Sequence, residues 1–216
     1  WKMDIVAKRI IAWTSNADIT LEDSDKAYKE KIFISLVKQS NFLLKNLNNL
    51  FYDSEKIICC SAIILSGLVF KDNDINYKSG IKELEKIIKI YFDKSGSPKS
   101  RNPEEVFICL KYLILIREWF KESQKPIPDF LNEIIHKCGN CYSLLSCSNK
   151  QFPLFNGATE TMQAASHGKA LYGNGDTDSA HSTVSDELKS FGGCSTGGFR
   201  LGHDTATVSS LTIGFI

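Results

Sequence analysis

The sequence lacks an excess of charge of either sign, and it lacks a long apolar run. Its 26 basic and 25 acidic residues give a formal charge of +1, whereas a dedicated nucleic-acid surface usually shows a clustered basic excess. The longest uncharged run, from Ile57 to Phe70, is too short to span a bilayer and is better interpreted as a buried helix. We therefore expect no nucleic-acid partner and no membrane span.

An initiating methionine and a signal-peptide pattern are also missing. The chain begins at Trp1, and no basic region, apolar region and cleavage site follow one another near it. We interpret the chain as a fragment or a processed product, with the bacterial cytoplasm and the periplasm both left open. Its seven cysteines are an odd number and several lie in apolar helical patterns, which favours reduced thiols over a disulfide framework.

No strong strand pattern occurs before residue 150, and apolar residues recur there at helical spacing instead. This periodicity predicts six helices, over residues 3–17, 25–47, 53–69, 77–92, 103–121 and 129–145. Asp53 is expected to cap the third of these helices. Short turns between the helices make consecutive antiparallel hairpins. We therefore predict an all-α fold in which antiparallel helical hairpins form part of an α/α toroid.

The composition changes near Gly157. From Ala158 onward the chain holds nine of its fourteen glycines, many serines and threonines, and few large apolar residues before Leu211. A segment of this kind cannot bury enough apolar area to offset the entropy of ordering its chain. We expect a helical domain over residues 1–157, followed by a low-complexity, irregular or disordered tail over residues 158–216.

The strongest candidate for a functional site is the polar stretch of residues 95–103, between two predicted helices. Arg101 and Asn102 lie together at the start of the second of these helices. Both side chains can neutralise a ligand carboxylate, and a helix N-terminus adds partial positive charge. The alternative is a helix-capping loop in which Arg101 pairs with Glu104 or Glu105. The sequence alone leaves both interpretations open.

Three further residues are candidates for contacting a sugar. Arg9 and Trp13 lie one helical turn apart, a spacing that could clamp and stack a sugar ring; the alternative places Trp13 in the core. Asn156 precedes Gly157, so it could present its amide to a groove or belong to an ordinary tight turn.

A cluster of potential zinc ligands occurs in the sixth predicted helix and just beyond it. A single Cys-x-x-Cys without a second matching pair is a weak signal, and thiols in apolar helical patterns are usually core residues. We therefore expect neither a metal site nor a cofactor. The residues concerned are His136, Cys138, Cys141 and Cys147.

Five short stretches, taken in order, resemble the N-terminal helical domain of heparinase II/III-family proteins from an uncharacterised bacterial branch. The resemblance covers roughly residues 1–157. It implies an α/α toroid followed by a β-sandwich, in a family that cleaves uronic-acid polysaccharides by β-elimination. The stretches are Ala7–Trp13, Ser35–Gln39, Ser100–Pro103, Leu115–Arg117 and Phe155–Gly157.

The resemblance also implies roles for the candidate residues. Arg101 and Asn102 would neutralise the uronate, Asn102 as a catalytic residue, with Asn156, Arg9 and Trp13 assisting in substrate binding. The general base is unassigned, because Pro98 and Glu105 stand where better-known members have His and Tyr. The nearest tyrosine on the same helix, Tyr112, is the candidate for that role.

We therefore expect the incomplete helical part of a polysaccharide lyase, a carbon–oxygen lyase whose partner is an acidic polysaccharide or oligosaccharide. A β-sandwich domain is expected in the complete parent protein. The alternative is a non-catalytic helical-hairpin module that binds a protein or a glycan on its concave face. The missing family His and Tyr favour this alternative.

Overall fold

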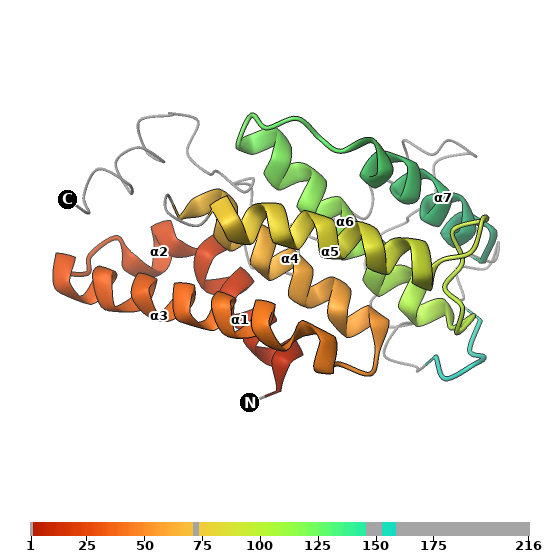
Figure 1. The fold of residues 1–216 in the computed structure, drawn as a ribbon, viewed down its shortest axis with the longest axis horizontal. Helices are drawn as coiled ribbons and strands as arrows, with labels where there is room; N and C mark the ends of the chain where they lie inside the picture. Colours follow the sequence, from red (N-terminus) through yellow and green to blue (C-terminus); the bar gives the residue numbers. More distant parts are fainter. Residues whose placement is uncertain (1, 71–73, 146–152, 159–216) are drawn as a thin grey trace. The chain divides into compact units, whose positions relative to one another are not determined.

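The computed structural model describes residues 2–70, 74–145 and 153–158. These residues form seven α-helices and one short 3-10 helix, and no β-strand occurs among them, which confirms the all-α prediction. The arrangement as part of a toroid stays a prediction. The elements are α1 (Met3–Ser15), α2 (Ala17–Leu21), α3 (Lys26–Asn46), η1 (Leu47–Asn49), α4 (Asp53–Val69), α5 (Asp74–Tyr91), α6 (Pro103–Glu122) and α7 (Asp129–Leu145) (Figure 1).

The six predicted helices are confirmed, with corrections at their ends: α5, for example, begins at Asp74, three residues before the predicted start at residue 77. The first predicted helix ends at Ser15 rather than residue 17, because the backbone leaves the helical conformation at Asn16, with φ of −112° and ψ of 20°. The backbone N–H and the side-chain amide of Asn16 both donate to the Ala12 carbonyl. The short helix α2 follows. The prediction of Asp53 as a cap is wrong, since Tyr52 holds the N-cap position and the Asp53 carboxylate accepts from Lys56 at 2.8 Å.

The described residues divide into two compact units. The first contains the described chain up to Leu84 together with Glu118–Pro126. The second contains Glu85–Arg117 and the described residues from Ile127 onward. The tail predicted for residues 158–216 lies, except for Ala158, outside the described residues.

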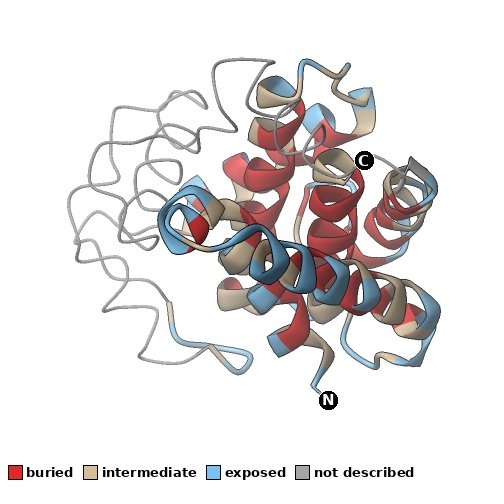
Figure 2. Ribbon diagram, turned by 90° about the vertical axis from the view of Figure 1, so that its left-hand side faces the viewer, coloured by how far each residue is buried: buried red, intermediate tan, exposed pale blue. Residues whose placement is uncertain are grey.

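In the first unit, α4 packs against both α1 and α3 (Figure 1). Every residue of α4 from Ile57 to Gly67 is buried, as expected for a helix with an apolar surface all round. Ser61 fits among these residues because its hydroxyl donates to the Ile57 carbonyl at 2.8 Å. Figure 2 shows buried positions along the inward faces of the helices and exposed positions along their outer faces.

The N-terminal part of α5 belongs to the same unit and approaches α4 very closely. A Cβ atom on Gly67 would lie 2.4 Å from the backbone nitrogen of Tyr77, so only glycine fits at this crossing. Nearby, the Asn76 side-chain amide donates to Asn41 Oδ1 at 2.7 Å and ties α5 to α3.

In the second unit, α6 and α7 pack through apolar side chains. The rings of Phe107 and Tyr142 lie with their centroids 6.0 Å apart, and Leu110, Leu113 and Ile114 are almost fully buried. The Cys138 thiol on α7 donates to the Gly96 carbonyl at 3.3 Å, which fixes α7 against the loop before α6. No helix of the described chain combines the length and the apolar character needed to cross a bilayer.

Replacing Gly67 with alanine should destabilise the protein. The added methyl group collides with the backbone of Tyr77, and overpacking of this kind costs about 1–3 kcal/mol. The matched control is Gly139→Ala in α7, where a Cβ meets no atom within 4 Å and alanine should stabilise the helix by about 0.5–1 kcal/mol. Urea unfolding followed by circular dichroism measures both changes. Equal stability of the two variants would contradict the close packing at Gly67.

Candidate functional site

The loop between α5 and α6 belongs to the second unit and is held by its own backbone. Phe92 and Pro98 form an antiparallel bridge. The Asp93 N–H donates to the Ser97 carbonyl at 2.9 Å, and the Lys99 N–H donates to the Tyr91 carbonyl at 3.0 Å. The polar stretch is therefore a tight, hydrogen-bonded loop that positions the residues at its end.

Asp93 organises the first half of this loop. Its Oδ1 atom accepts hydrogen bonds from the Ser95 backbone at 2.8 Å, the Ser95 hydroxyl at 2.6 Å and the Ser97 backbone at 3.0 Å. The Ser95 hydroxyl bond lowers the pKa of the Asp93 carboxyl most, and the charge of Arg101 lowers it further. Between the two serines, Gly96 has a φ of +83° and lies against α7, where a Cβ would come within 2.5 Å of Lys137.

Asn102 caps α6. Its Oδ1 atom accepts from the Glu104 N–H at 2.9 Å, and its carbonyl accepts from the Val106 N–H at 3.3 Å. Pro103 begins the helix, as its fixed φ and missing N–H favour. The capping interpretation is therefore correct for Asn102. Its Nδ2 group forms no hydrogen bond with the residues that the structure describes, so it is available as a donor.

Arg101 is exposed and adopts a left-handed backbone conformation, with a φ of +53°. A side chain other than glycine in this region is uncommon and costs roughly 1 kcal/mol. Hydrogen bonds on both sides hold it there. Its N–H donates to the Pro98 carbonyl at 2.8 Å, and its carbonyl accepts from the Asn156 side-chain amide at 3.1 Å.

Asn156 reaches Arg101 from a tight turn. Asn156 and Gly157 both have positive φ, 50° and 92°, and the Ala158 N–H donates to the Phe155 carbonyl at 3.1 Å. This is the ordinary Asn-Gly turn that the sequence allows, and its asparagine amide is also turned toward the loop. The structure thus brings Arg101, Asn102 and Asn156 together, since the Cβ position of Gly157 lies 3.5 Å from Asn102 Nδ2.

A hydrogen-bonded cluster beside these residues was not predicted. The Tyr91 hydroxyl donates to Glu105 Oε2 at 2.5 Å, and the Ser100 hydroxyl donates to the same oxygen. Burial raises the pKa of Tyr91 above its usual range, and the neighbouring Cys109 and Glu105 raise it further. No spacing rule links Tyr91 at the end of one helix to Glu105 in the first turn of the next, so the sequence held no signal for this pair.

The other predicted site residues lie elsewhere. Tyr112 is on α6 but only 9% exposed, and no described contact joins it to Asn102. Arg9 is exposed on α1 in the first unit, where its Nε donates to Gln39 Oε1 at 2.9 Å. Trp13 is half-buried, because the buried face of α1 passes through Ile10 and Thr14 instead.

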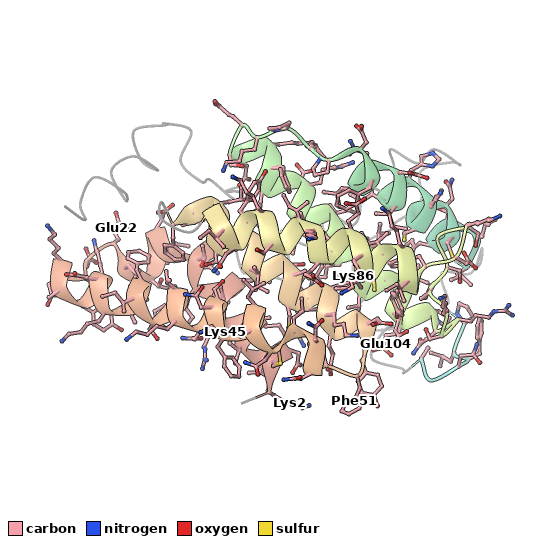
Figure 3. All side chains as sticks on the ribbon, in the orientation of Figure 1. Lys2, Glu22, Lys45, Phe51, Lys86 and Glu104 are labelled. Carbon is pink, nitrogen blue, oxygen red and sulfur yellow. The ribbon has the colours of Figure 1, made fainter. Side chains whose placement is uncertain are left out.

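The first unit contains a cleft that none of the predicted residues lines. It has a volume of about 400 Å³ and lies where α2 meets the N-terminal half of α3. Glu22, labelled in Figure 3, lines this cleft. The other lining residues are Ala17, Asp18, Ile19, Leu21, Lys29 and Phe33.

The cysteines behave as core residues where the structure describes them. Cys138 is buried, Cys141 is half-buried, and both are free thiols. Burial raises the pKa of each thiol, which disfavours the thiolate that a zinc site needs. Within the described ranges, no three His, Cys, Asp or Glu side chains lie close enough together to hold a metal ion, and Cys147 falls outside those ranges.

The assembled residues provide the elements of an anion site. The exposed guanidinium of Arg101, the amide Nδ2 of Asn102 and the N-terminus of α6 can all attract a carboxylate. Comparison of the chain with protein-family models, with curated proteins and with solved structures finds no match. The resemblance to heparinase II/III proteins therefore rests on the five short stretches of sequence and stays a prediction.

Substitutions of Asn102 should separate its capping role from its side-chain amide. Asn102→Ala removes the acceptor for the Glu104 N–H and should lower the free energy of unfolding by about 1 kcal/mol. Asn102→Asp keeps an acceptor oxygen and should be close to the wild type in stability. Chemical denaturation measures both variants. A stable Asn102→Ala variant would show that the cap contributes little.

The buried Tyr91 hydroxyl should make stability depend on pH in the alkaline range. In the unfolded chain the tyrosine ionises near pH 10, the ordinary pKa of this side chain, whereas burial in the fold raises its pKa and keeps it protonated. Its contribution is therefore fully present below about pH 10 and declines as the pH rises above that value. The free energy of unfolding, measured from pH 8 to 11, should therefore fall less steeply above about pH 10 in Tyr91→Phe than in the wild type. Parallel curves for the two proteins would refute the assignment.

Proposed function

We propose that the chain is the helical part of a polysaccharide lyase that acts by β-elimination on uronic-acid glycans, with the uronate bound at Arg101 and Asn102. The observation that carries this proposal is the meeting of Arg101, Asn102 and Asn156 at the start of α6. Asn156 is 55 residues away from Arg101 in sequence, so the fold assembles residues that the resemblance had selected independently.

The chemistry explains why donors are needed at this point. In β-elimination a base removes the proton from the carbon next to the uronate carboxylate, a carbon–carbon double bond forms, and the carbon–oxygen bond to the neighbouring sugar breaks. The departing oxygen keeps the electron pair of that bond and takes up a proton from an acid or from water to become a hydroxyl group. A charged carboxylate opposes the first step, because proton loss places more negative charge beside it. Donation from Arg101 and Asn102 and the partial charge of α6 would stabilise that developing charge.

The general base is not supplied by this cluster. Burial keeps Tyr91 protonated and its hydroxyl donates to Glu105, while Tyr112 is buried along α6. A base must reach the proton that it removes within hydrogen-bonding distance. We therefore assign the uronate-binding half of the reaction to this chain, and the base to the remainder of the complete parent protein.

The second candidate is a glycan-binding module without catalysis of its own. Two observations favour it: Asn102 Oδ1 is already engaged in capping, and the nearby tyrosine is held protonated. Binding and catalysis make different predictions for the same sample, because only elimination leaves a conjugated, ultraviolet-absorbing uronate.

The test uses the purified chain with a galacturonate disaccharide and with longer uronate glycans. We expect binding by calorimetry that Arg101→Ala weakens by about tenfold, the loss of one charged hydrogen-bonding partner. Asn102→Asp should weaken it similarly while keeping the fold, because it replaces a donor with a negative charge. The control, Lys137→Ala, removes a charge already paired with Glu133 and should leave affinity unchanged.

The absorbance trace tests whether this chain carries a base of its own. A growing signal near the conjugated-uronate band would establish the lyase in this chain alone and overturn the assignment of the base to another part of the parent protein. Binding without that signal is expected of a lyase part that lacks its base, and equally of the module. Absence of disaccharide binding, or equal binding by the wild type, Arg101→Ala and Asn102→Asp, would refute the uronate site.

A further inference from the structure

The outer face of α3 carries a row of three lysines, Lys31, Lys38 and Lys45, which we name the lysine row. All three are exposed, and Figure 3 shows Lys45 projecting from the helix. Residues seven apart return to nearly the same side of an α-helix, with about 10 Å between successive positions along its axis. The row therefore runs almost parallel to α3 for about four turns.

No carboxylate compensates the lysine row along its own face of α3. The positions three and four residues before and after each of its members hold apolar or uncharged polar side chains. Among the described residues, no hydrogen bond or ion pair engages any of the three. Five lysines on other helices, by contrast, pair with a carboxylate one turn away on their own helix: Lys8–Asp4, Lys56–Asp53, Lys89–Glu85, Lys121–Glu118 and Lys137–Glu133.

The opposite face of α3 fixes the row in place. Phe33, Leu36, Ser40 and Leu43 are buried, and the helix packs against both α1 and α4. Side-chain hydrogen bonds add to this packing, since Gln39 accepts from Arg9 on α1 at 2.9 Å. The row is thus presented on a supported helix. The spacing of about 10 Å slightly exceeds the Debye length of about 8 Å at physiological salt, so each lysine would contact a linear ligand as a largely separate charge.

We propose that the lysine row is a binding track for a linear acidic polysaccharide lying along α3. The row offers regularly spaced positive charge, which matches a polymer with regularly spaced carboxylates. The choice of an acidic glycan rests on the proposed function. The track itself does not involve Arg101 or Asn102, which belong to the other unit.

Other polyanionic partners fit this face less well. An anionic membrane needs an apolar face beside the charges, and on α3 only Tyr28 and Ile34 are large apolar side chains exposed in the structure described. A single-stranded nucleic acid needs a series of exposed aromatic rings between the cations to stack its bases, whereas this face has one ring between members of the row, the half-buried Phe42. Beyond the end of α3, the 94% exposed ring of Phe51 offers a flat apolar surface to a sugar ring (Figure 3).

The test compares two triple variants that remove the same total charge. The first is Lys31→Gln with Lys38→Gln and Lys45→Gln, which leaves good helix formers on α3. The control is Lys89→Gln with Lys121→Gln and Lys137→Gln, which removes lysines already paired with carboxylates. Each protein is titrated with fluorescent polygalacturonate chains, with a galacturonate disaccharide, with oligo-dT and with vesicles containing phosphatidylserine, at several salt concentrations.

We expect the first triple variant to bind the long polygalacturonate at least about tenfold more weakly than the wild type, with a shallower dependence of affinity on salt. The control should change affinity by less than about twofold. The disaccharide should bind both variants equally, because it is too short to follow the row.

The outcomes separate this proposal from the uronate site at Arg101. Suppose that Arg101→Ala abolishes binding of the disaccharide, while both triple variants bind the long polygalacturonate equally well. This result would overturn the track and leave the uronate site standing. If only the first triple variant loses binding of the long polygalacturonate, and Arg101→Ala leaves binding of the disaccharide unchanged, the track is supported and the uronate site is overturned. Row-dependent binding of oligo-dT or vesicles in preference to polygalacturonate, or no binding of the long chain by the wild type, would overturn the assigned partner.

Discussion

The start of α6 imposes a constraint that the loop before it must satisfy, because the first N–H groups of a helix have no partner within the helix. Asn102 meets this need with its side-chain oxygen, and Pro103 removes one of the donors altogether. The Nδ2 group of Asn102 remains available to donate to a ligand. Fold and proposed function therefore depend on different atoms of one side chain, and the direction of that side chain is set by the helix that it caps.

The helices could be predicted because the sequence pattern that indicates each of them lies within the helix itself. Apolar periodicity located six of the seven α-helices in the described ranges, and the uncharged run of α4 indicated its burial. The short helix α2 was missed because it has too few residues to show a period. At α4 the cap was misassigned, since Tyr52 holds the N-cap position and the Asp53 carboxylate accepts from the Lys56 side chain rather than from a backbone N–H of the first helical turn.

The candidate site was predictable in part. The residue types of Arg101, Asn102 and Asn156 suggested a role in binding, but only the fold shows that the turn at Asn156 lies against the loop. The cluster of Tyr91, Ser100 and Glu105 gave no sequence signal, because its members are joined by packing between α5 and α6. Whether a side chain such as Trp13 is buried or exposed likewise depends on the neighbouring helices, which a periodicity along one helix does not specify.

The three hydrogen bonds accepted by Asp93 have a consequence for how a ligand would be received. They fix the backbone of the loop before any ligand arrives, and Gly96 holds it against α7. Binding to such a preorganised surface does not require the chain to lose further conformational freedom, so more of the contact energy remains as affinity. A loop built in this way also favours rapid capture of its ligand, because no slow rearrangement has to precede the encounter.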